Sequence, residues 1–348
     1  MAGKNDPALL NYCAGIMLPQ LKTLQSTAER IINRSNIEDI HDIRVASRRV
    51  RTCLTIFKDT FPAKKYRNWV KDIKSITNSY GAVRDLDVQI DLLNRVIEGV
   101  NDKKLLPGLR RVRLRLKQQR AKKQTKTSTL TRSIIDSRTI SEMLEWCDKF
   151  GNQEIIKSPA LFQLGYLNIQ SHLDEFLFFE VFIFDSSRIK ELHQMRIAAK
   201  KLRYSLEVFS DLYDHETDFA LDIARQSQEI LGQIHDADVW INFLPNFTNN
   251  EQNKISNFYG YDSPFSRLSP GIDFLMENRT QERQKLYKKF LNLWRKWKLK
   301  ESWLNLRKVI FLTSIEEYEK QDLITSQIDT SKLENTIENP HNQEPNNQ

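Results

Sequence analysis

Two segments of the chain repeat the same alternation of apolar and cationic positions at helical spacing. His41 to Phe57 reads HDIRVASRRVRTCLTIF, and His193 to Phe209 reads HQMRIAAKKLRYSLEVF. On a helix with about 100° per residue, one side of the first segment is apolar: Ile43, Ala46, Val50, Leu54 and Phe57. The other side holds His41, Arg44, Arg48 and Arg51 within an arc of roughly 80°, with Arg49 on its flank. The pattern predicts two amphipathic helices that each carry a cationic stripe.

The two segments align over seventeen positions without a gap, and six positions are identical. A second motif follows each of them. Gly81 lies 40 residues after His41, Gly232 lies 39 residues after His193, and each glycine is followed four residues later by Asp-x-Asp-Val. Two motifs in the same order at nearly the same spacing indicate an internal duplication. A single basic helix is often only a solvated surface, but two copies that keep five basic residues and no acid on this arc weaken that interpretation.

The remaining apolar periodicity predicts further helices, and no segment shows the alternation typical of strands. We expect an all-α protein of two pseudo-symmetric four-helix bundles in tandem, residues 6–150 and 158–318, with a shared basic cleft. One predicted helix runs from about residue 109 to 150. Residues 249–271 are polar, contain Gly260, Pro264 and Pro270, and predict a long loop. Residues 321–348 are rich in Asn, Gln and Glu, and we expect a disordered tail there.

The chain of 348 residues has a net charge of +8. Its last 28 residues carry one Lys and five acidic residues, so the rest of the chain is more basic than this total. A body this basic is typical of proteins with a polyanionic partner: nucleic acid, an anionic membrane or a phosphate polymer. Cys13, Cys53 and Cys147 have no metal-type spacing, so we expect reduced thiols and a cytoplasmic location. The N-terminal residues lack the pattern of a signal peptide, so we expect none, and the apolar run at 176–184 is too short to span a bilayer, so no membrane partner is expected.

With these motifs, the chain resembles the CHAD family, the conserved-histidine α-helical domain. The resemblance rests on His41 to Arg51 and His193 to Arg203, followed by Tyr80 to Val88 and Leu231 to Val239, and covers roughly residues 6–318. It implies two helical bundles whose basic helices line one cleft that binds inorganic polyphosphate. The second copy departs from the first, with Lys200 and Lys201 in place of Arg48 and Arg49, and His235 in place of Arg84.

Polyphosphate presents closely spaced anionic oxygens and no bases, so its site needs Arg and Lys on rigid helices. A basic run at 109–126, with nine Lys or Arg, and a second at 285–300 stand at matching places in the two halves and are interpreted as further lining of the cleft. Sequence alone does not say which basic face of the first run points inward. The candidate polyphosphate-binding residues are His41, Arg44, Arg48, Arg49, Arg51, Arg113, Lys117, Arg120, His193, Arg196, Lys200, Lys201, Arg203, Lys285 and Lys289.

The acidic pairs Asp85/Asp87 and Asp236/Asp238 invite a magnesium interpretation. Residues two apart on a helix point in different directions, so we expect no metal and no cofactor. These four aspartates are instead expected to pair with an arginine of the basic helix, or to cap a turn, and so to orient the cations.

No nucleotide-binding, nucleophile or zinc motif occurs in the chain, so we expect no enzymatic activity. Three functions remain: a polyphosphate-binding protein, a nucleic-acid-binding protein, or an accessory subunit for a polyphosphate-metabolising enzyme. Nucleic acid is the less favoured partner, because the cationic faces carry almost no aromatic side chain for base stacking. Association with polyphosphate granules would fit the first and the third function.

Overall fold

The computed structural model describes residues 6–33, 37–136, 138–151 and 157–337, and this part of the chain is helical without strands. The all-α prediction is confirmed. The α-helices are α1 (Pro7–Asn33), α2 (Ile37–Ile56), α3 (Ala63–Glu98), α4 (Leu106–Asp136), α5 (Thr139–Gly151), α6 (Pro159–Phe178), α7 (Ile189–Phe209), α8 (Asp218–Tyr259), α9 (Ser269–Leu299) and α10 (Ser302–Ile337). Short 3-10 turns are η1 (Lys58–Thr60), η2 (Phe179–Phe182), η3 (Asp211–Tyr213) and η4 (Ser263–Arg267).

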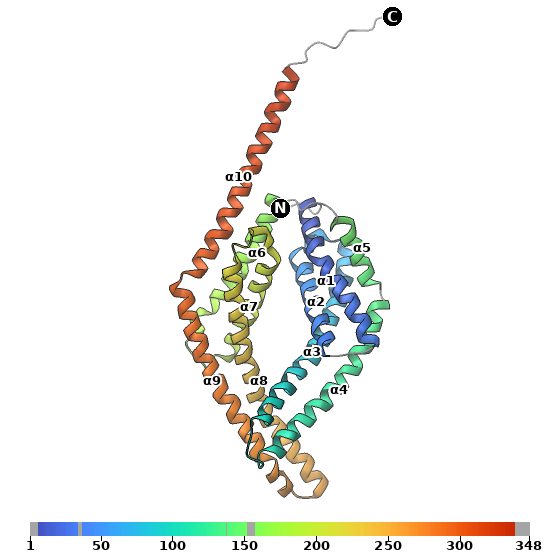
Figure 1. The fold of residues 1–348 in the computed structure, drawn as a ribbon, viewed down its shortest axis with the longest axis vertical. Helices are drawn as coiled ribbons and strands as arrows, with labels where there is room; N and C mark the ends of the chain where they lie inside the picture. The colour runs from blue at the N-terminus through green and yellow to red at the C-terminus, as the bar shows by residue number, and fades with distance from the viewer. Residues whose placement is uncertain (1–5, 34–36, 137, 152–156, 338–348) are drawn as a thin grey trace, which may run out of the picture.

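The helices form two groups that follow the sequence duplication (Figure 1). In the view shown, α1, α2 and α5 lie on one side and α6 and α7 on the other, while α3, α4, α8 and α9 converge at the lower end. Over the described residues each half contributes five α-helices, not the four of the predicted bundles. The fifth helix of the first half arises because the predicted helix at 109–150 is interrupted beside Arg138, whose φ of 59° is left-handed.

One apolar cluster fills both halves and passes between them. The Tyr12 ring of α1 stacks on the Phe209 ring of α7 with centroids 6.2 Å apart, and the Phe57 centroid lies 6.1 Å from that of Phe209. The Tyr12 hydroxyl donates a hydrogen bond of 2.9 Å to the carbonyl of Val208. These aromatic contacts join the ends of the two repeated basic helices, because Phe57 and Phe209 are the last residues of the two repeated segments.

A second apolar cluster joins the halves where α3, α4, α8 and α9 meet, and it contains Leu93, Val112, Trp240, Leu244 and Leu275 among its members. The first turns of α4 and α9 pass so closely there that glycine is required. A Cβ atom on Gly108 would lie 2.1 Å from the Leu268 carbonyl oxygen, and one on Gly271 would lie 2.0 Å from that of Leu105. Both positions therefore exclude any side chain.

The prediction of a long loop at 249–271 is wrong. Helix α8 continues to Tyr259, η4 follows, and α9 begins at Ser269. The polar composition hid a helical stripe, because Phe247, Glu251 and Ile255 recur every four residues and all three are buried.

Helix α10 also continues beyond residue 321, where a disordered tail was expected, and ends at Ile337. No glycine or proline interrupts the chain between Ser302 and Pro340, so nothing in the sequence ends the helix earlier. The rest of the predicted tail, 338–348, lies outside the described residues. In Figure 1 the C-terminal half of α10 extends away from the two groups of helices.

Candidate anion-binding site

Helices α2 and α7 place their two arcs as the repeat predicts. Ile43, Ala46, Val50 and Leu54 of α2 are buried, as are Met195, Leu202 and Phe209 of α7. The cationic arcs stay partly accessible. Arg44, Arg48 and Arg51 of α2 and Arg196, Lys200 and Arg203 of α7 are all half-buried. Burial of the apolar arc fixes each helix rotationally, and so fixes where the cations point.

The cations of the two helices converge on one another. The Arg48 guanidinium of α2 lies 4.8 Å above the ring centroid of Tyr204 on α7. The pKa of Lys200 is lowered, first by burial and then by repulsion from four guanidiniums, which belong to Arg196, Arg48, Arg44 and Arg51. Three of these four belong to the opposite helix. The ammonium of one repeat is therefore exposed to the positive charge of the other.

Several polar groups in this basic cluster have no hydrogen-bond partner among the residues that the structure describes. The Nε atoms of Arg48 and Arg196, the Nδ1 atom of His193 and the Tyr204 hydroxyl are buried without a hydrogen bond. A buried donor left unpaired costs about 1–3 kcal/mol. Arg48, Arg196 and Tyr204 therefore hold donors without acceptors close to where the two basic helices meet.

The second motif of each repeat lies directly against the basic helix. A Cβ atom on Gly232 would lie 3.5 Å from the Nε of Arg196, and one on Gly81 would lie 3.9 Å from the Nε of Arg44. Each arginine therefore packs against the neighbouring helix, α8 or α3, beside its glycine. The glycine and the arginine of the two motifs are thus neighbours in both halves.

The two predicted histidines lie in different surroundings. His193 packs against His235 with ring centroids 4.1 Å apart. The pKa of each is lowered, first by burial and then by nearby cations, with Arg196 acting on both. Both rings are therefore neutral at pH 7. His41 is exposed, with its Nδ1 3.3 Å from the Asp42 carboxylate.

The aspartates do not pair with the basic helices as predicted. Asp87 forms an ion pair with Arg120 of α4, and Asp238 forms one with Arg283 of α9. The prediction failed because the side chain at the second Asp of each motif points toward the following long helix. The first Asp points toward the centre: the pKa of Asp236 is raised by burial, lowered by Arg196 and raised again by Asp85 of the other half.

The surroundings of the aspartates were also compared with the requirements of a metal site. No group of three or more His, Cys, Asp or Glu side chains in the described part of the chain could hold a metal ion. The aspartates instead have a repeated arrangement. The second one of each motif binds an arginine of a long helix, and Asp236, the first one of the second motif, is influenced by Arg196 and by Asp85.

The sequence profile of the CHAD domain matches residues 15–245, about two thirds of the chain. The chain belongs to the CHAD domain family. A CHAD domain crystal structure from the plant Ricinus communis is similar, with a TM-score of 0.55, 20% identity, and coverage of 80% of this chain and 87% of that one.

PptA from Streptomyces chartreusis is also similar, with a TM-score of 0.54, 12% identity, and coverage of 82% and 99%. At these identities both likenesses concern the fold alone. No curated protein matches the chain. No helix in the described part of the chain is both long and apolar enough to cross a membrane.

Within this CHAD domain, the two basic faces of α4 have different contacts. Arg111 and Arg115 bind the buried carboxylate of Glu251 on α8, each with an Nε–Oε distance of 2.7 Å. On the other face, Lys117 and Arg120 line a groove with Arg84 and Arg95 of α3. Arg113 donates a 3.2 Å hydrogen bond to Asn94 of α3. The predicted stripe of Arg113, Lys117 and Arg120 is therefore the one beside α3.

Other predicted residues lie apart from the central cluster. Lys285 and Lys289 line a pocket along α9 with Lys288 and Lys296, and no residue of α2 or α7 contributes to it. The ammonium of Lys201 lies 2.6 Å from Glu175 of α6. Residues that share a basic run in the sequence are thus divided between the centre and the periphery.

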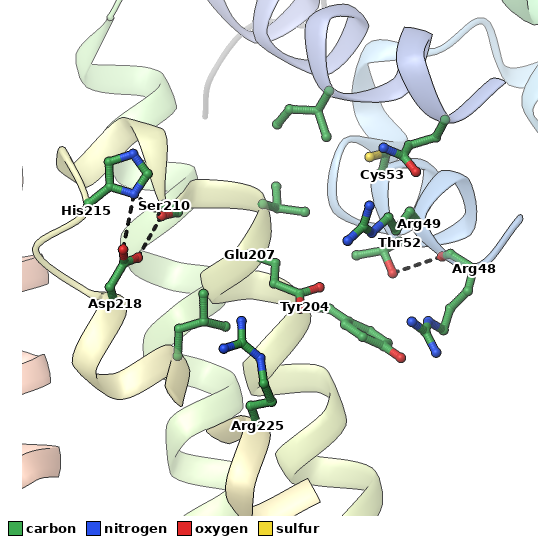
Figure 2. Close-up of a pocket in the computed structure, with 14 residues that line it drawn as sticks. Arg48, Arg49, Thr52, Cys53, Tyr204, Glu207, Ser210, His215, Asp218 and Arg225 are labelled. Carbon is green, nitrogen blue, oxygen red and sulfur yellow. Dashed lines mark hydrogen bonds and ion pairs between the residues drawn. The ribbon is translucent and has the colours of Figure 1, made fainter. Parts of the chain in front are cut away.

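Sequence reasoning missed some central groups. The Tyr204 hydroxyl and the His235 ring lie among the predicted cations, but neither was included with them. Their signal was available, because Tyr204 flanks the cationic arc of its helix and His235 stands at the place of Arg84 in the duplication. No sequence signal indicates the residues of α1 and α8 that complete a pocket of 420 Å³ beside Arg48 and Tyr204 (Figure 2).

Proposed function

We propose that this CHAD domain binds inorganic polyphosphate along the converging cationic arcs of α2 and α7. The observation that carries the proposal is the contact between the two arcs, where the Arg48 guanidinium of α2 lies 4.8 Å from the Tyr204 ring of α7 and the charges of α2 lower the pKa of Lys200. So many like charges repel one another, and a polyanion would relieve this repulsion. Arginine also binds two oxygens of a phosphate at once, which suits a chain of closely spaced phosphates.

The surface chemistry favours a phosphate polymer over nucleic acid. Single-stranded nucleic acids are held by exposed aromatic rings on which bases stack. On the cationic arcs of α2 and α7, the aromatic residue is Tyr204, which is buried and has the Arg48 guanidinium over its ring. A ring covered in this way offers no platform for a base, so the arcs are suited to a ligand without bases.

We propose a binding role without catalysis. The central carboxylates are engaged by arginines or lie beside them, and the unpaired groups are donors for an anion. The same surface would also serve an accessory subunit that holds the polymer for a polyphosphate-metabolising enzyme. A cytoplasmic location at polyphosphate granules would suit either role.

The test is a titration of the purified protein with long-chain polyphosphate and with RNA of equal total charge, in the same buffer at physiological salt. We expect polyphosphate to bind at least tenfold more tightly than RNA. Equal affinities would leave only a nonspecific polyanion surface, and tighter binding of RNA would overturn the proposal. Phosphate release from polyphosphate with Mg²⁺, measured in the same samples, would contradict the non-catalytic role.

A further inference from the structure

We propose that the pocket between α1, α2, α7 and α8 binds the organic body of a phosphate ester of the nucleotide class. The inference goes beyond polyphosphate binding, and only its competition experiment depends on that function. The pocket has a volume of 420 Å³ and is lined by both halves of the molecule. A site of this size at the junction of two units is typical of small-molecule binding.

One part of the pocket is suited to phosphate. Arg49 of α2 and Arg225 of α8 face the pocket from opposite halves, on either side of Glu207 (Figure 2). No described residue forms an ion pair with Arg49, and the Arg225 guanidinium lies 2.7 Å from the exposed Asp222. Arg48 lines the pocket and also belongs to the central cationic cluster. A phosphate tail in the pocket would therefore reach the arginine that polyphosphate also uses.

The rest of the lining is unsuited to a bare phosphate chain. Ile16, Val208 and Leu221 form apolar walls, while Glu207 and Asp218 present carboxylates. Carboxylates repel phosphate but accept hydrogen bonds from hydroxyl and amino groups. A nucleoside supplies both an apolar ring and such donors, so a nucleotide complements each part of the pocket.

The pocket also contains a serine, a histidine and an aspartate, but their geometry is that of a binding site. The Ser210 hydroxyl donates to Asp218 at 2.9 Å and lies 3.0 Å from His215 Nδ1. The same Nδ1 atom lies 3.2 Å from the other carboxylate oxygen of Asp218. A catalytic triad needs the two ring nitrogens to serve serine and aspartate separately. Here Nδ1 faces both Ser210 and Asp218, while Nε2 lies 3.6 Å from Asp211, too far for a hydrogen bond.

The experiment compares ATP, GTP, CTP and UTP with tripolyphosphate, which has the same number of phosphates and no nucleoside, by calorimetry without Mg²⁺. We expect at least one nucleotide to bind about tenfold more tightly than tripolyphosphate. Arg225→Ala should weaken that nucleotide about tenfold and leave long-chain polyphosphate within twofold. Leu221→Glu should abolish nucleotide binding, and Arg188→Ala, a distant exposed arginine, is the matched control.

If no nucleotide binds better than tripolyphosphate, the inference is wrong. It is also wrong if Arg225→Ala weakens tripolyphosphate as much as the nucleotide. The bound nucleotide should compete with long-chain polyphosphate through Arg48. Nucleotide binding without any polyphosphate binding would instead contradict the proposed function and leave this inference standing.

Discussion

Helices α2 and α7 occupy equivalent places in the two halves, but their flanking cations meet different neighbours. In α7, Lys201 is bound to Glu175 and the Nε of Arg203 lies 2.7 Å from Glu207. Their equivalents in α2, Arg49 and Arg51, have no carboxylate partner among the described residues. The duplication thus conserves the central cations, Arg44 with Arg196 and Arg48 with Lys200, and lets the flanks diverge. We infer that the first copy supplies more uncompensated charge to a bound anion.

The largest expected effect tests the part that the two copies share. Arg44→Ala and Arg196→Ala should each weaken polyphosphate binding about tenfold, because each removes one charge-assisted phosphate contact. The salt dependence of the affinity should become shallower by about one contact in both variants. Polyphosphate titrations over a range of salt concentrations measure both quantities. Loss of binding in one variant and no change in the other would mean that only one half binds.

A smaller effect should separate the flanks. Arg49→Ala should weaken polyphosphate binding about threefold, because its guanidinium is free to meet a phosphate. Lys201→Ala, at the equivalent position, should change the affinity by less than twofold, since Glu175 already neutralises that ammonium. Both side chains are exposed, so both variants should fold normally. Equal losses in the two variants would show that the ion pair with Glu175 opens when polyphosphate binds.

The cationic arcs could be predicted because they depend on local geometry. The helical period alone separates Arg44, Arg48 and Arg51 from Ile43 and Val50, and burial of the apolar side then orients the arc. The duplication also matched the Gly81 and Gly232 segments, and in the structure each glycine lies next to the equivalent arginine, Arg44 or Arg196. Features that belong to a single helix, or that recur in both copies, could therefore be predicted from the sequence.

Contacts between segments far apart in the chain could not be predicted from the sequence. Asp87 and Arg120 are 33 residues apart, and Arg111 and Glu251 are 140 apart, so no periodicity connects them. The predicted loop at 249–271 failed for the same reason. Asn249 and Asn250 indicate a turn when taken locally, but the packing of Phe247 and Ile255 against α3 and α4 side chains stabilises the helix there.

A third difference between the halves should appear in the pH dependence. Burial is the first cause that lowers the pKa values of His193 and His235. His235, Arg196 and Lys200 lower the pKa of His193 further, and Arg196 lowers that of His235, while Asp238 opposes both shifts and Asp85 opposes the second. Bound polyphosphate brings negative charge that raises these pKa values, so binding takes up protons. Affinity should therefore increase about threefold between pH 7.5 and pH 5.5. In the free protein the unfolded chain takes up these protons first, so stability falls as the pH drops through about 6.5.

Melting temperatures at pH 7.5 and 5.5, with and without polyphosphate, measure the direction of the pH dependence of both the affinity and the stability. The double variant His193→Gln/His235→Gln should flatten both dependences. His41→Gln, in the half where Arg84 replaces the second histidine, is the matched control and should alter them less. An unchanged pH dependence in the double variant would assign it to other groups.

The smallest expected effect on affinity comes from the contact that joins the halves far from the basic arcs. Glu251 is buried, which alone would raise its pKa, but hydrogen bonds from Arg115, Lys254 and Arg111 outweigh burial and lower the pKa to about 2. Because the folded state favours the charged carboxylate, its contribution is present above about pH 4.5 and is lost as the pH falls toward 2.

Glu251→Gln removes this charge and leaves Arg111 and Arg115 without a counterion, although both remain partly accessible to water. We expect a loss of about 2 kcal/mol in the free energy of unfolding and a melting temperature ~5 °C lower at pH 7. The difference in stability from the wild type should shrink as the pH approaches 3. Polyphosphate affinity at pH 7 should stay within twofold, because neither arginine belongs to the arcs of α2 and α7. A tenfold loss of affinity in a folded variant would show that this junction sets the spacing of the two basic helices.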